Sequence, residues 1–440
     1  MGSRPMARPG SGSGSDRWFA IKTQIHTRLL NSLSPDQLRG LNKEGVRDQI
    51  GAVLERLVKE ENIPMTVTER ERLIEEILDE VFGLGPLEPL MKDSTVSDIM
   101  VNGYDNVYVE RGGLMVETNI RFKDPAHVRM IIERIVSNIG RRIDDSSPIV
   151  DARLNDGSRM CAVIPPVSLI GPVMSIRRFG KKLLTVEDLL KNETFTSGML
   201  DFFSGCVEAR MNIVCSGGSG SGKTTMLNTL SRFIPDEQRL VTIEDVAELQ
   251  MQQSHLVRLE TRPMNIEGAG AITQRDLVIN ALRMRPDRII IGECRGSEAF
   301  DMMQAMNTGH DGSMTTVHAN SARDAFSRLE TMVMMASQHV PDYVIRQMLS
   351  AAVQLVVHMN RLPDGSRKIV SIAEVCETDG HSTEMHDIFV FEREGMSQSG
   401  KVIGRFRATG YLPRCLQRLK AYGIHVSQSI FHDEHAVKER

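Results

Sequence analysis

The chain has 440 residues, which is enough for two or three domains that each bury their own core. With 53 Lys and Arg against 57 Asp and Glu, its formal net charge of -4 gives no support for strong non-specific binding of nucleic acid. Six scattered cysteines without a C-x-x-C pair, and no apolar run long enough to cross a bilayer, argue against a zinc site, a disulfide framework and direct membrane insertion.

The N-terminal part of the chain predicts a tail followed by helices. Residues 1–16 are rich in glycine and serine, and we interpret them as a disordered tail or an expression tag. Residues 17–82 predict a small helical bundle, because apolar side chains recur at helical spacing in two stretches. The two apolar sets are Val46, Ile50, Val53 and Leu57, and then Leu73, Ile77, Leu78, Val81 and Phe82. A capping box at Thr68–Glu71 is expected to start the second helix.

Residues 83–180 predict an α+β domain. The composition shifts towards strands after the helix-breaking stretch 83–86, and a hairpin is expected around Gly112 and Gly113. A helix with apolar residues at helical spacing is expected to end at Gly140. Further strands are predicted around 160–164 and 173–177.

Residues 181–440 predict an α/β domain with a parallel sheet. Apolar strands alternate with helices, which is typical of a parallel sheet covered by helices on both faces. The expected strands are 212–215, 240–243, 289–291 and 314–317. A C-terminal β/helical appendage is expected to begin with strands 355–359 and 368–375, which flank the turn signal Pro363-Asp364-Gly365, and to continue with a strand near 388–391.

The stretch after the first of these strands carries the strongest motif in the chain. It fits the pattern G-x-x-x-x-G-K-[ST]. The loop consists of Gly217, Gly218, Ser219, Gly220, Ser221, Gly222, Lys223 and Thr224, and Thr225 follows it. The glycines let the backbone curl around a phosphate with its N–H groups pointing inward. Lys223 supplies a positive charge to the β- and γ-phosphates, and Thr224 offers a hydroxyl group to Mg²⁺. Because an apolar strand precedes the loop and an apolar helix follows it, we favour a nucleoside triphosphate site over a flexible linker.

Acidic residues end two further strands of the predicted sheet. Glu293 follows the apolar strand 288–291 and is expected to act on the Mg²⁺ side, through water, because Gly292 stands where many ATPases have Asp. Glu248 is favoured as the base that polarises the attacking water, with Glu244 in support. Each acid taken singly could instead be a solvated loop carboxylate.

His318 ends the strand that starts at Met314. Its imidazole could sense the γ-phosphate by hydrogen bonding, or it could satisfy a loop carbonyl. Without other evidence the second interpretation is favoured.

Together these motifs resemble the secretion ATPases of the type II/type IV secretion superfamily. The resemblance rests on the phosphate loop and on the stretches 242–248, 289–295 and 309–318, and it spans roughly 77–431. Within the superfamily the chain looks most like the Tad/Flp pilus assembly ATPases of the CpaF type. The stretches that support this subtype are 97–103, 140–144, 151–159, 176–179 and 282–288. The scattered cysteines do not fit the tetracysteine domain of many type II members, which also favours this branch.

The resemblance implies a RecA-like P-loop ATPase fold for the C-terminal domain and a homo-hexamer that hydrolyses ATP with Mg²⁺. It implies a cytoplasmic ring, held at the inner membrane by pilus platform proteins, that powers pilus assembly, with retraction by the same motor left open. It also implies arginines from the N-terminal domain that stabilise charge on the transferred phosphate. The matching positions are Arg153, Arg159, Arg177 and Arg178, and each of them could instead form a surface ion pair.

Other functions stay open at this point. A type IV secretion ATPase that moves effectors or DNA would carry the same motifs. A nucleotide-dependent scaffold with negligible turnover would share the loop but have no need of the acids. A helicase is disfavoured by the near-neutral charge, and no specific nucleic-acid partner is expected. A small-molecule kinase is disfavoured because no acceptor pocket or lid can be recognised.

Overall fold

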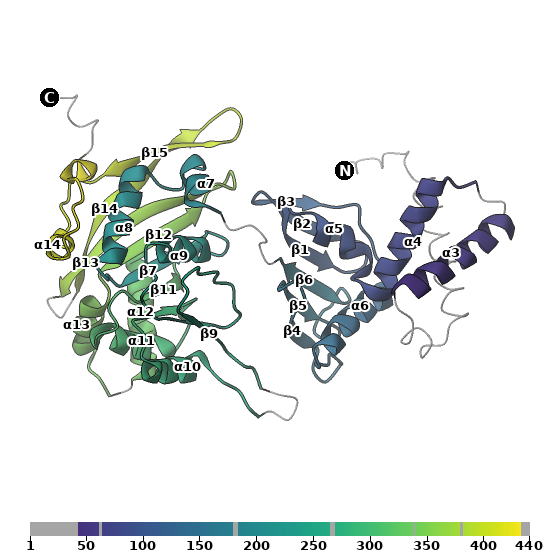
Figure 1. Ribbon diagram of the computed structural model, residues 1–440, viewed down its shortest axis with the longest axis horizontal. Helices are drawn as coiled ribbons and strands as arrows, with labels where there is room; N and C mark the ends of the chain where they lie inside the picture. The colour runs from purple at the N-terminus through teal and green to yellow at the C-terminus, as the bar shows by residue number, and fades with distance from the viewer. Residues whose placement is uncertain are drawn as a thin grey trace, which may run out of the picture. The chain divides into compact units, whose positions relative to one another are not determined.

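The fold is taken from a computed structural model of the chain (Figure 1), and it describes residues 43–60, 64–178, 184–264, 269–337, 339–378 and 382–432. The predicted tail at 1–16 and the start of the predicted helical bundle lie outside these residues. The chain divides into two compact units, Met1–Phe179 and Gly180–Arg440, which are considered one at a time. Within the described part, no helix combines the length and the apolar character that a bilayer crossing requires.

Among the described residues, two helices lie in the stretch that is predicted to form a helical bundle. They are α3 (Lys43–Glu60) and α4 (Val67–Phe82), and they pack through a small apolar cluster that includes Ile50 and Ile77. The predicted capping box at Thr68 is wrong by two residues. Thr66 is the N-cap residue, its side chain accepts the N–H of Glu69, and the Glu69 carboxylate accepts the N–H of Thr66 in return. Both Thr66 and Thr68 have a glutamate three residues later, so the capping pattern alone could not separate them.

The N-terminal sheet has six antiparallel strands in the order β3-β2-β1-β6-β5-β4. The strands are β1 (Val96–Asn102), β2 (Val107–Arg111), β3 (Leu114–Glu117), β4 (Ile149–Arg153), β5 (Arg159–Val163) and β6 (Val173–Arg177). The associated helices are η1 (Gly85–Leu87), α5 (Glu88–Lys92) and α6 (Pro125–Asn138). The predicted hairpin is confirmed: Gly112 and Gly113 both have positive φ, as a two-residue hairpin turn requires. One face of the sheet buries its alternate residues in a core shared with α6.

The second unit is built on one nine-stranded sheet in the order β15-β14-β13-β12-β7-β11-β10-β8-β9. Its strands are β7 (Ile213–Gly217), β8 (Leu240–Glu244), β9 (Leu256–Glu260), β10 (Arg288–Ile291), β11 (Met314–His318), β12 (Leu355–Arg361), β13 (Arg367–Thr378), β14 (Thr383–Met396) and β15 (Val402–Ala408). The six strands from β12 to β9 are all parallel to one another. The predicted parallel sheet is therefore confirmed.

Helices cover both faces of this sheet (Figure 1), as the alternation of strands and helices predicts. They are α7 (Val186–Lys191), α8 (Ser197–Glu208), α9 (Lys223–Ser231), α10 (Gln274–Ala281), η2 (Leu282–Met284), α11 (Glu298–Asn307), α12 (Ala322–Ala336), α13 (Asp342–Ala352), α14 (Leu416–Ala421) and η3 (Gln428–Phe431). Successive residues of β7 serve opposite cores: Ile213 and Cys215 pack with α8 and α9, and Val214 packs with α10 to α13. Burial on both sides explains why these strands are continuous apolar runs.

The C-terminal strands are not an appendage, because they continue the central sheet. β12 lies directly beside β7 and parallel to it, and β13, β14 and β15 extend the sheet from there as an antiparallel meander. The core order β12-β7-β11-β10-β8 separates the phosphate-loop strand β7 from the acidic strand β10 by one strand, which is the RecA-like arrangement.

Candidate nucleotide site

The phosphate loop leaves the carboxyl end of β7 and ends in the first turn of α9. Glycine is required at two of its positions for physical reasons. A Cβ on Gly217, where φ is 151°, would lie 2.3 Å from the carbonyl oxygen of Met359 on β12. Gly222 caps α9 with a φ of 103°, in the left-handed region that favours glycine. Thr224 and Thr225 follow in the first turn of the helix, where free N–H groups and the helix dipole favour an anion.

Lys223 is buried, and its ammonium group contacts the backbone at the start of the loop. Its Nζ donates to the carbonyl oxygens of Gly217 at 3.0 Å and Gly218 at 2.8 Å. It also lies 3.3 Å from Nε2 of His318, at the end of β11. The loop lysine and the predicted histidine therefore belong to one site.

A chain of polar contacts runs from Lys223 across the carboxyl ends of the neighbouring strands. Nε2 of His318 lies 3.2 Å from Glu293 Oε1, just after β10. The other oxygen of Glu293 accepts from Arg295 at 2.8 Å, and Arg295 reaches Asp245, after β8, at 3.3 Å. Four strands thus bring two cations, two carboxylates and an imidazole to one edge of the sheet, which is the edge from which the phosphate loop rises.

The imidazole of His318 is placed to exchange hydrogen-bond partners. Burial, followed by the charge of Lys223, lowers the pKa of His318 below its usual value, which favours the neutral ring. A neutral ring nitrogen either accepts from Lys223 or donates to Glu293, but it cannot do both. His318 is consequently a group through which a change at Lys223 can be transmitted to Glu293.

Glu244 and Glu248 form the acidic pair at the end of β8. The Glu244 side chain is buried, and its Oε1 accepts the backbone N–H groups of Glu248 and Leu249, both at 2.8 Å. Burial raises the pKa of Glu244, although those two hydrogen bonds act in the opposite direction. The geometry agrees with support of Glu248 by Glu244, since one carboxylate fixes the backbone that carries the other.

A hydrogen bond between two buried side chains lies directly below the loop. Ser216 Oγ and His358 Nδ1 are 2.9 Å apart, where β7 and β12 pair. The pKa of His358 is lowered, mainly by burial, although a backbone hydrogen bond with Asn320 opposes this shift. Ser216, next to Gly217, is thereby linked through His358 to Asn320, which follows His318 by two residues.

The donor set near the loop fits Mg²⁺ bound largely through phosphate and water. Among the residues the structure describes, no group of three or more His, Cys, Asp or Glu side chains could hold a metal. Mg²⁺ keeps several waters and commonly takes only one or two carboxylates besides substrate phosphates. Thr224, in the first helical turn, and Glu293 are suitable in type, and Oε2 of Glu244 is a buried carboxylate oxygen without a hydrogen-bond partner.

Three of the four candidate arginines in the N-terminal unit form one row. Arg153 on β4 pairs with Arg159 on β5, which pairs with Arg177 on β6. Residues directly opposite each other on adjacent strands share a face, so the three side chains leave the sheet on the side opposite the α6 core. Arg178 is placed differently, because its guanidinium donates to the carbonyl oxygens of Asp93 and Val96.

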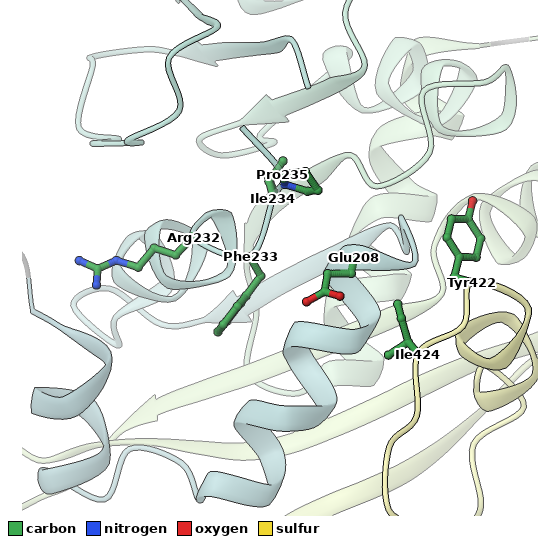
Figure 2. A pocket seen from close by; sticks show the side chains of 7 residues that line it. All are labelled: Glu208, Arg232, Phe233, Ile234, Pro235, Tyr422 and Ile424. Carbon is green, nitrogen blue, oxygen red and sulfur yellow. The ribbon is translucent and has the colours of Figure 1, made fainter. Parts of the chain in front are cut away.

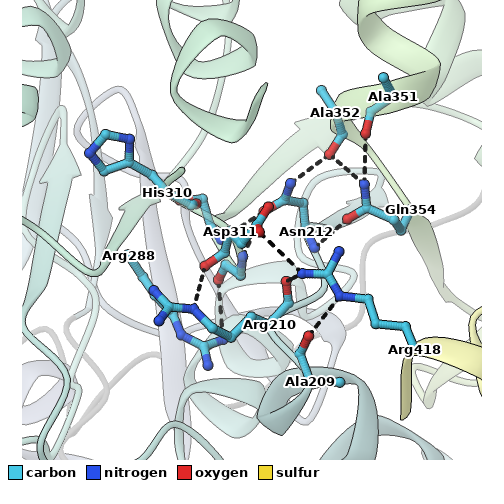
Figure 3. A network of polar contacts seen from close by, with 12 residues as sticks. Ala209, Arg210, Asn212, Arg288, His310, Asp311, Ala351, Ala352, Gln354 and Arg418 are labelled. Carbon is cyan, nitrogen blue, oxygen red and sulfur yellow. Dashed lines mark hydrogen bonds and ion pairs between the residues drawn. The ribbon is translucent and has the colours of Figure 1, made fainter. Parts of the chain in front are cut away.

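Some residues of the quoted motifs form a polar network at the amino end of β7, the end opposite the phosphate loop (Figure 3). Oδ1 of Asn212, just before β7, accepts the N–H groups of Gly312 and Ser313 at 2.8 and 2.9 Å. Arg288 is fully buried and donates to the carbonyl oxygens of Gly312 and Val207. Burial lowers the pKa of Arg288 to about 9. Because this network lies at the amino end of β7, these residues support the fold and lie away from the phosphate loop.

A surface cavity of about 510 Å³ lies at the carboxyl end of α9 (Figure 2). Its lining comes from the end of α8, from the segment that follows α9 and from the residues after α14. The lining residues are Glu208, Arg232, Phe233, Ile234, Pro235, Tyr422 and Ile424. The phosphate loop is at the other end of the same helix, so this cavity is distinct from the nucleotide site.

Two members of the polar chain, Arg295 and Asp245, were not among the predicted site residues. Arg295 is within two residues of Glu293, and Asp245 follows Glu244, so both stood inside the quoted motifs. Their contact joins segments 50 residues apart, which no local spacing indicates.

Comparison with known proteins identifies the family of this chain. A family described as "Type II/IV secretion system protein" matches residues 80–421, and one described as "Type II secretion system protein E, N-terminal domain" matches residues 18–82. A Mycobacterium tuberculosis protein provisionally named as a conjugal transfer protein, Rv3659c, is 36% identical over 307 residues, which are 68% of this chain and 87% of that protein. The conjugal transfer protein TrbB of Rhizobium radiobacter is 33% identical over 296 residues, which are 66% and 86% of the two chains.

A solved structure of the VirB11 ATPase from the Brucella suis type IV secretion system, in complex with sulphate, shares 29% identity over 68% of this chain and 97% of that chain, with a TM-score of 0.37. At this TM-score the family assignment rests on the sequence matches. Since one family model covers residues 80–421 and includes every predicted site residue, the chain belongs to the type II/IV secretion system protein family.

Proposed function

We propose that the protein is an ATPase that powers a type IV secretion or conjugal transfer system. The observation that carries the proposal is the contact chain from Lys223 through His318 to Glu293 and Arg295, beside the pair Glu244 and Glu248. Relatives named for conjugal transfer and type IV secretion support the choice of system. This revises the order of the sequence interpretations, in which a Tad/Flp pilus motor stood first.

Each residue has a role in this proposal. Lys223 binds the β- and γ-phosphates, Glu248 orients and deprotonates the attacking water, and Glu244 holds Glu248 in place. His318 passes the state of the terminal phosphate to Glu293. Mg²⁺, when bound near Thr224 and Glu293, would neutralise phosphate charge. Such a site binds ATP in one arrangement of contacts and releases ADP from another, which is what a motor requires.

The arginine row is the second part of the proposal. Arg153, Arg159 and Arg177 concentrate positive charge on one face of the N-terminal sheet, and we assign them to stabilising charge on the transferred phosphate, in the same chain or in another copy. Arg178 is left out, because its guanidinium already binds backbone carbonyls. A homo-hexamer, as the resemblance implies, would provide the copies.

A Tad/Flp pilus assembly ATPase is the second candidate. The named conjugal relatives align with only about two thirds of this chain, and residues 18–82 match the N-terminal domain of a type II secretion protein instead. The match of residues 18–82 to the N-terminal domain of a type II secretion protein is the observation that keeps this candidate open.

Two experiments test these proposals. Steady-state ATPase assays on Lys223→Ala and Glu248→Ala should show loss of turnover, and near wild-type turnover in either variant would contradict the assignment. Deleting the gene in its source cell should then abolish transfer of DNA or effectors while surface pili persist. Loss of pili with normal transfer would favour the second candidate.

A further inference from the structure

The hairpin between β12 and β13 lies against the phosphate loop on the side of β7 away from the acids. β12 pairs in parallel with β7 up to Met359 and Gly217, and it continues for two residues to Arg361. Arg361 pairs directly with Arg367, the first residue of β13. Two guanidinium side chains therefore leave the same face of the hairpin at the level of the loop.

Both arginines are in contact range of the loop. Nε of Arg367 donates to the carbonyl oxygen of Gly220 at 2.8 Å. A Cβ on Gly220 would lie 3.6 Å from Nη1 of Arg361, and one on Gly222 would lie 3.6 Å from Cδ of Arg367. These are ordinary van der Waals distances, so both arginine side chains lie directly beside the loop.

The hairpin turn is firmly held, which fixes where the arginines stand. Asp364 accepts the N–H and the hydroxyl of Ser366 at 3.0 and 2.6 Å, and its other oxygen accepts the N–H of Val402 on β15 at 2.9 Å. The first two bonds close the turn, and the third ties it to β15. The arginine pair is thus presented by a rigid element.

Electrostatics indicate what such a pair is for. Like charges placed directly opposite each other on adjacent strands are destabilising. An anion next to them lessens this repulsion and can accept a charge-assisted hydrogen bond from a guanidinium group. The phosphate chain of a nucleotide in the adjoining loop is the anion that this position would meet.

The position also indicates which end of the nucleotide the hairpin meets. Glu293 and Glu248 follow β10 and β8, which lie on the β11 side of β7, so the terminal phosphate that water attacks should point to that side. β12 lies on the opposite side of β7. The α-phosphate and the nucleoside then leave the loop towards the hairpin.

We propose that the β12–β13 hairpin completes the nucleotide site, with Arg361 binding the α/β-phosphate end of the nucleotide and Arg367 positioning the loop through Gly220. This inference rests on the proposed function, since it takes the nucleotide direction from the roles of the acids. It adds two residues, distant in sequence from the loop, to the determinants of nucleotide affinity.

The test separates binding from turnover. Dissociation constants for ADP and for a slowly hydrolysed ATP analogue are measured on the full chain and on Arg361→Gln, Arg361→Lys and Arg367→Gln. Arg405→Gln is the matched control, because Arg405 lies on β15 in an exposed ladder with Glu392. Removing one charge-assisted contact should weaken both nucleotides by a similar factor of about tenfold in Arg361→Gln. The lysine variant should recover part of the loss, and the control should bind like the wild type.

The kinetic and thermal readouts complete the test. In Arg361→Gln, KM for ATP should rise while kcat at saturation stays near the wild-type value, because the contact is shared by substrate and transition state. For Arg367→Gln, the Tm without nucleotide should be close to that of the wild type, whereas the rise in Tm on adding ADP should shrink. Unchanged affinity in both arginine variants overturns the inference. A loss confined to the ATP analogue also overturns it, because the contact would then face the γ-phosphate.

The proposed function can fail separately. A wild-type protein that binds both nucleotides through the hairpin without hydrolysing ATP would contradict the motor and leave this inference standing. A wild-type protein that hydrolyses ATP but is indifferent to both arginine substitutions would contradict only the inference. A protein that binds neither nucleotide would overturn both.

Discussion

Oε1 of Glu244 accepts the backbone N–H of Glu248 at 2.8 Å, so the buried acid of β8 sets the position of the acid four residues later. The same oxygen accepts the N–H of Leu249, which fixes the backbone on both sides of the Glu248 carbonyl. Burial raises the pKa of Glu244 while these two hydrogen bonds lower it, so the position that Glu244 imposes and the charge that it carries are distinct contributions.

Substitutions of Glu244 should therefore separate position from charge. Glu244→Gln retains a carbonyl oxygen that can accept both N–H groups, so we expect its turnover to stay within about threefold of the wild type. Glu244→Ala leaves two N–H groups without an acceptor and should lower turnover by about tenfold or more and reduce stability by about 2 kcal/mol. ATPase assays and urea unfolding measure the two effects. Equal losses in both variants would show that the charge itself is needed.

Glu248→Gln should retain nucleotide binding and lose hydrolysis. Loss of a general base typically costs about 10² to 10⁴ in rate, while the loop and Lys223 still bind the phosphates. Nucleotide affinity by titration and single-turnover hydrolysis give the two readouts. Glu237→Gln is a suitable control, because Glu237 is exposed in the loop that leads into the amino end of β8, the end opposite Glu248. A Glu248 variant with wild-type single-turnover rates would remove Glu248 from the mechanism.

The arginine row allows a test of action between subunits. Lys223→Ala protein lacks the loop lysine, and Arg159→Gln protein lacks the central cation of the row. If the arginine acts on the nucleotide of another copy, mixing the two inactive proteins should restore part of the ATPase rate. If it acts within its own chain, no combination in the mixture should recover activity above the sum of the two.

The buried pair Ser216 and His358 predicts a pH dependence of stability. The folded protein holds the pKa of His358 below the usual 6.5, so the unfolded chain binds more protons as the pH falls through that value. The free energy of unfolding should therefore decrease as the pH falls from 7 towards 5. In His358→Asn this decrease should be smaller. Urea unfolding at several pH values measures the slopes, and equal slopes in the two proteins would contradict the prediction.

The network in Figure 3 predicts a pair of glycine substitutions with unequal costs. Gly312 has a φ of 83°, and a Cβ there would lie 2.5 Å from Nη1 of the fully buried Arg288. Gly309 has a similar φ of 93°, with nothing within 4 Å of an added Cβ. Gly309→Ala should cost about 1 kcal/mol, from the backbone conformation alone. Gly312→Ala should cost about 3 kcal/mol or more, because the clash adds to that conformational cost. Thermal unfolding compares them, and equal costs would rule out the clash.

The parallel strands were predictable because burial on both faces makes them continuous apolar runs, as in Ile289–Ile291. The strand β9 was missed because its residues are only partly buried or exposed, at the edge of the sheet, so it lacks that signature. The membership of β12 in the core was missed for a different reason. A local turn signal predicts a hairpin but does not say which strand the hairpin will join.

The site residues likewise fall into those that local sequence predicts and those that only the fold reveals. The loop residues and the acids followed from spacing and residue type, whereas the contact between Lys223 and His318 joins positions 95 residues apart and became visible only in the fold. The hairpin arginines gave no local signal at all, because their relation to Gly220 depends on β12 lying beside β7.

The strand β7 is held at both of its ends, by Asn212 at its start and by the close approach of Met359 to Gly217 at its finish. A strand fastened at both ends is expected to keep its position when the loop binds and releases nucleotide. Under the proposed function, a movement that follows hydrolysis would then pass through the side chains at the carboxyl ends of the strands and the segments that they hold, while the centre of the sheet stays still.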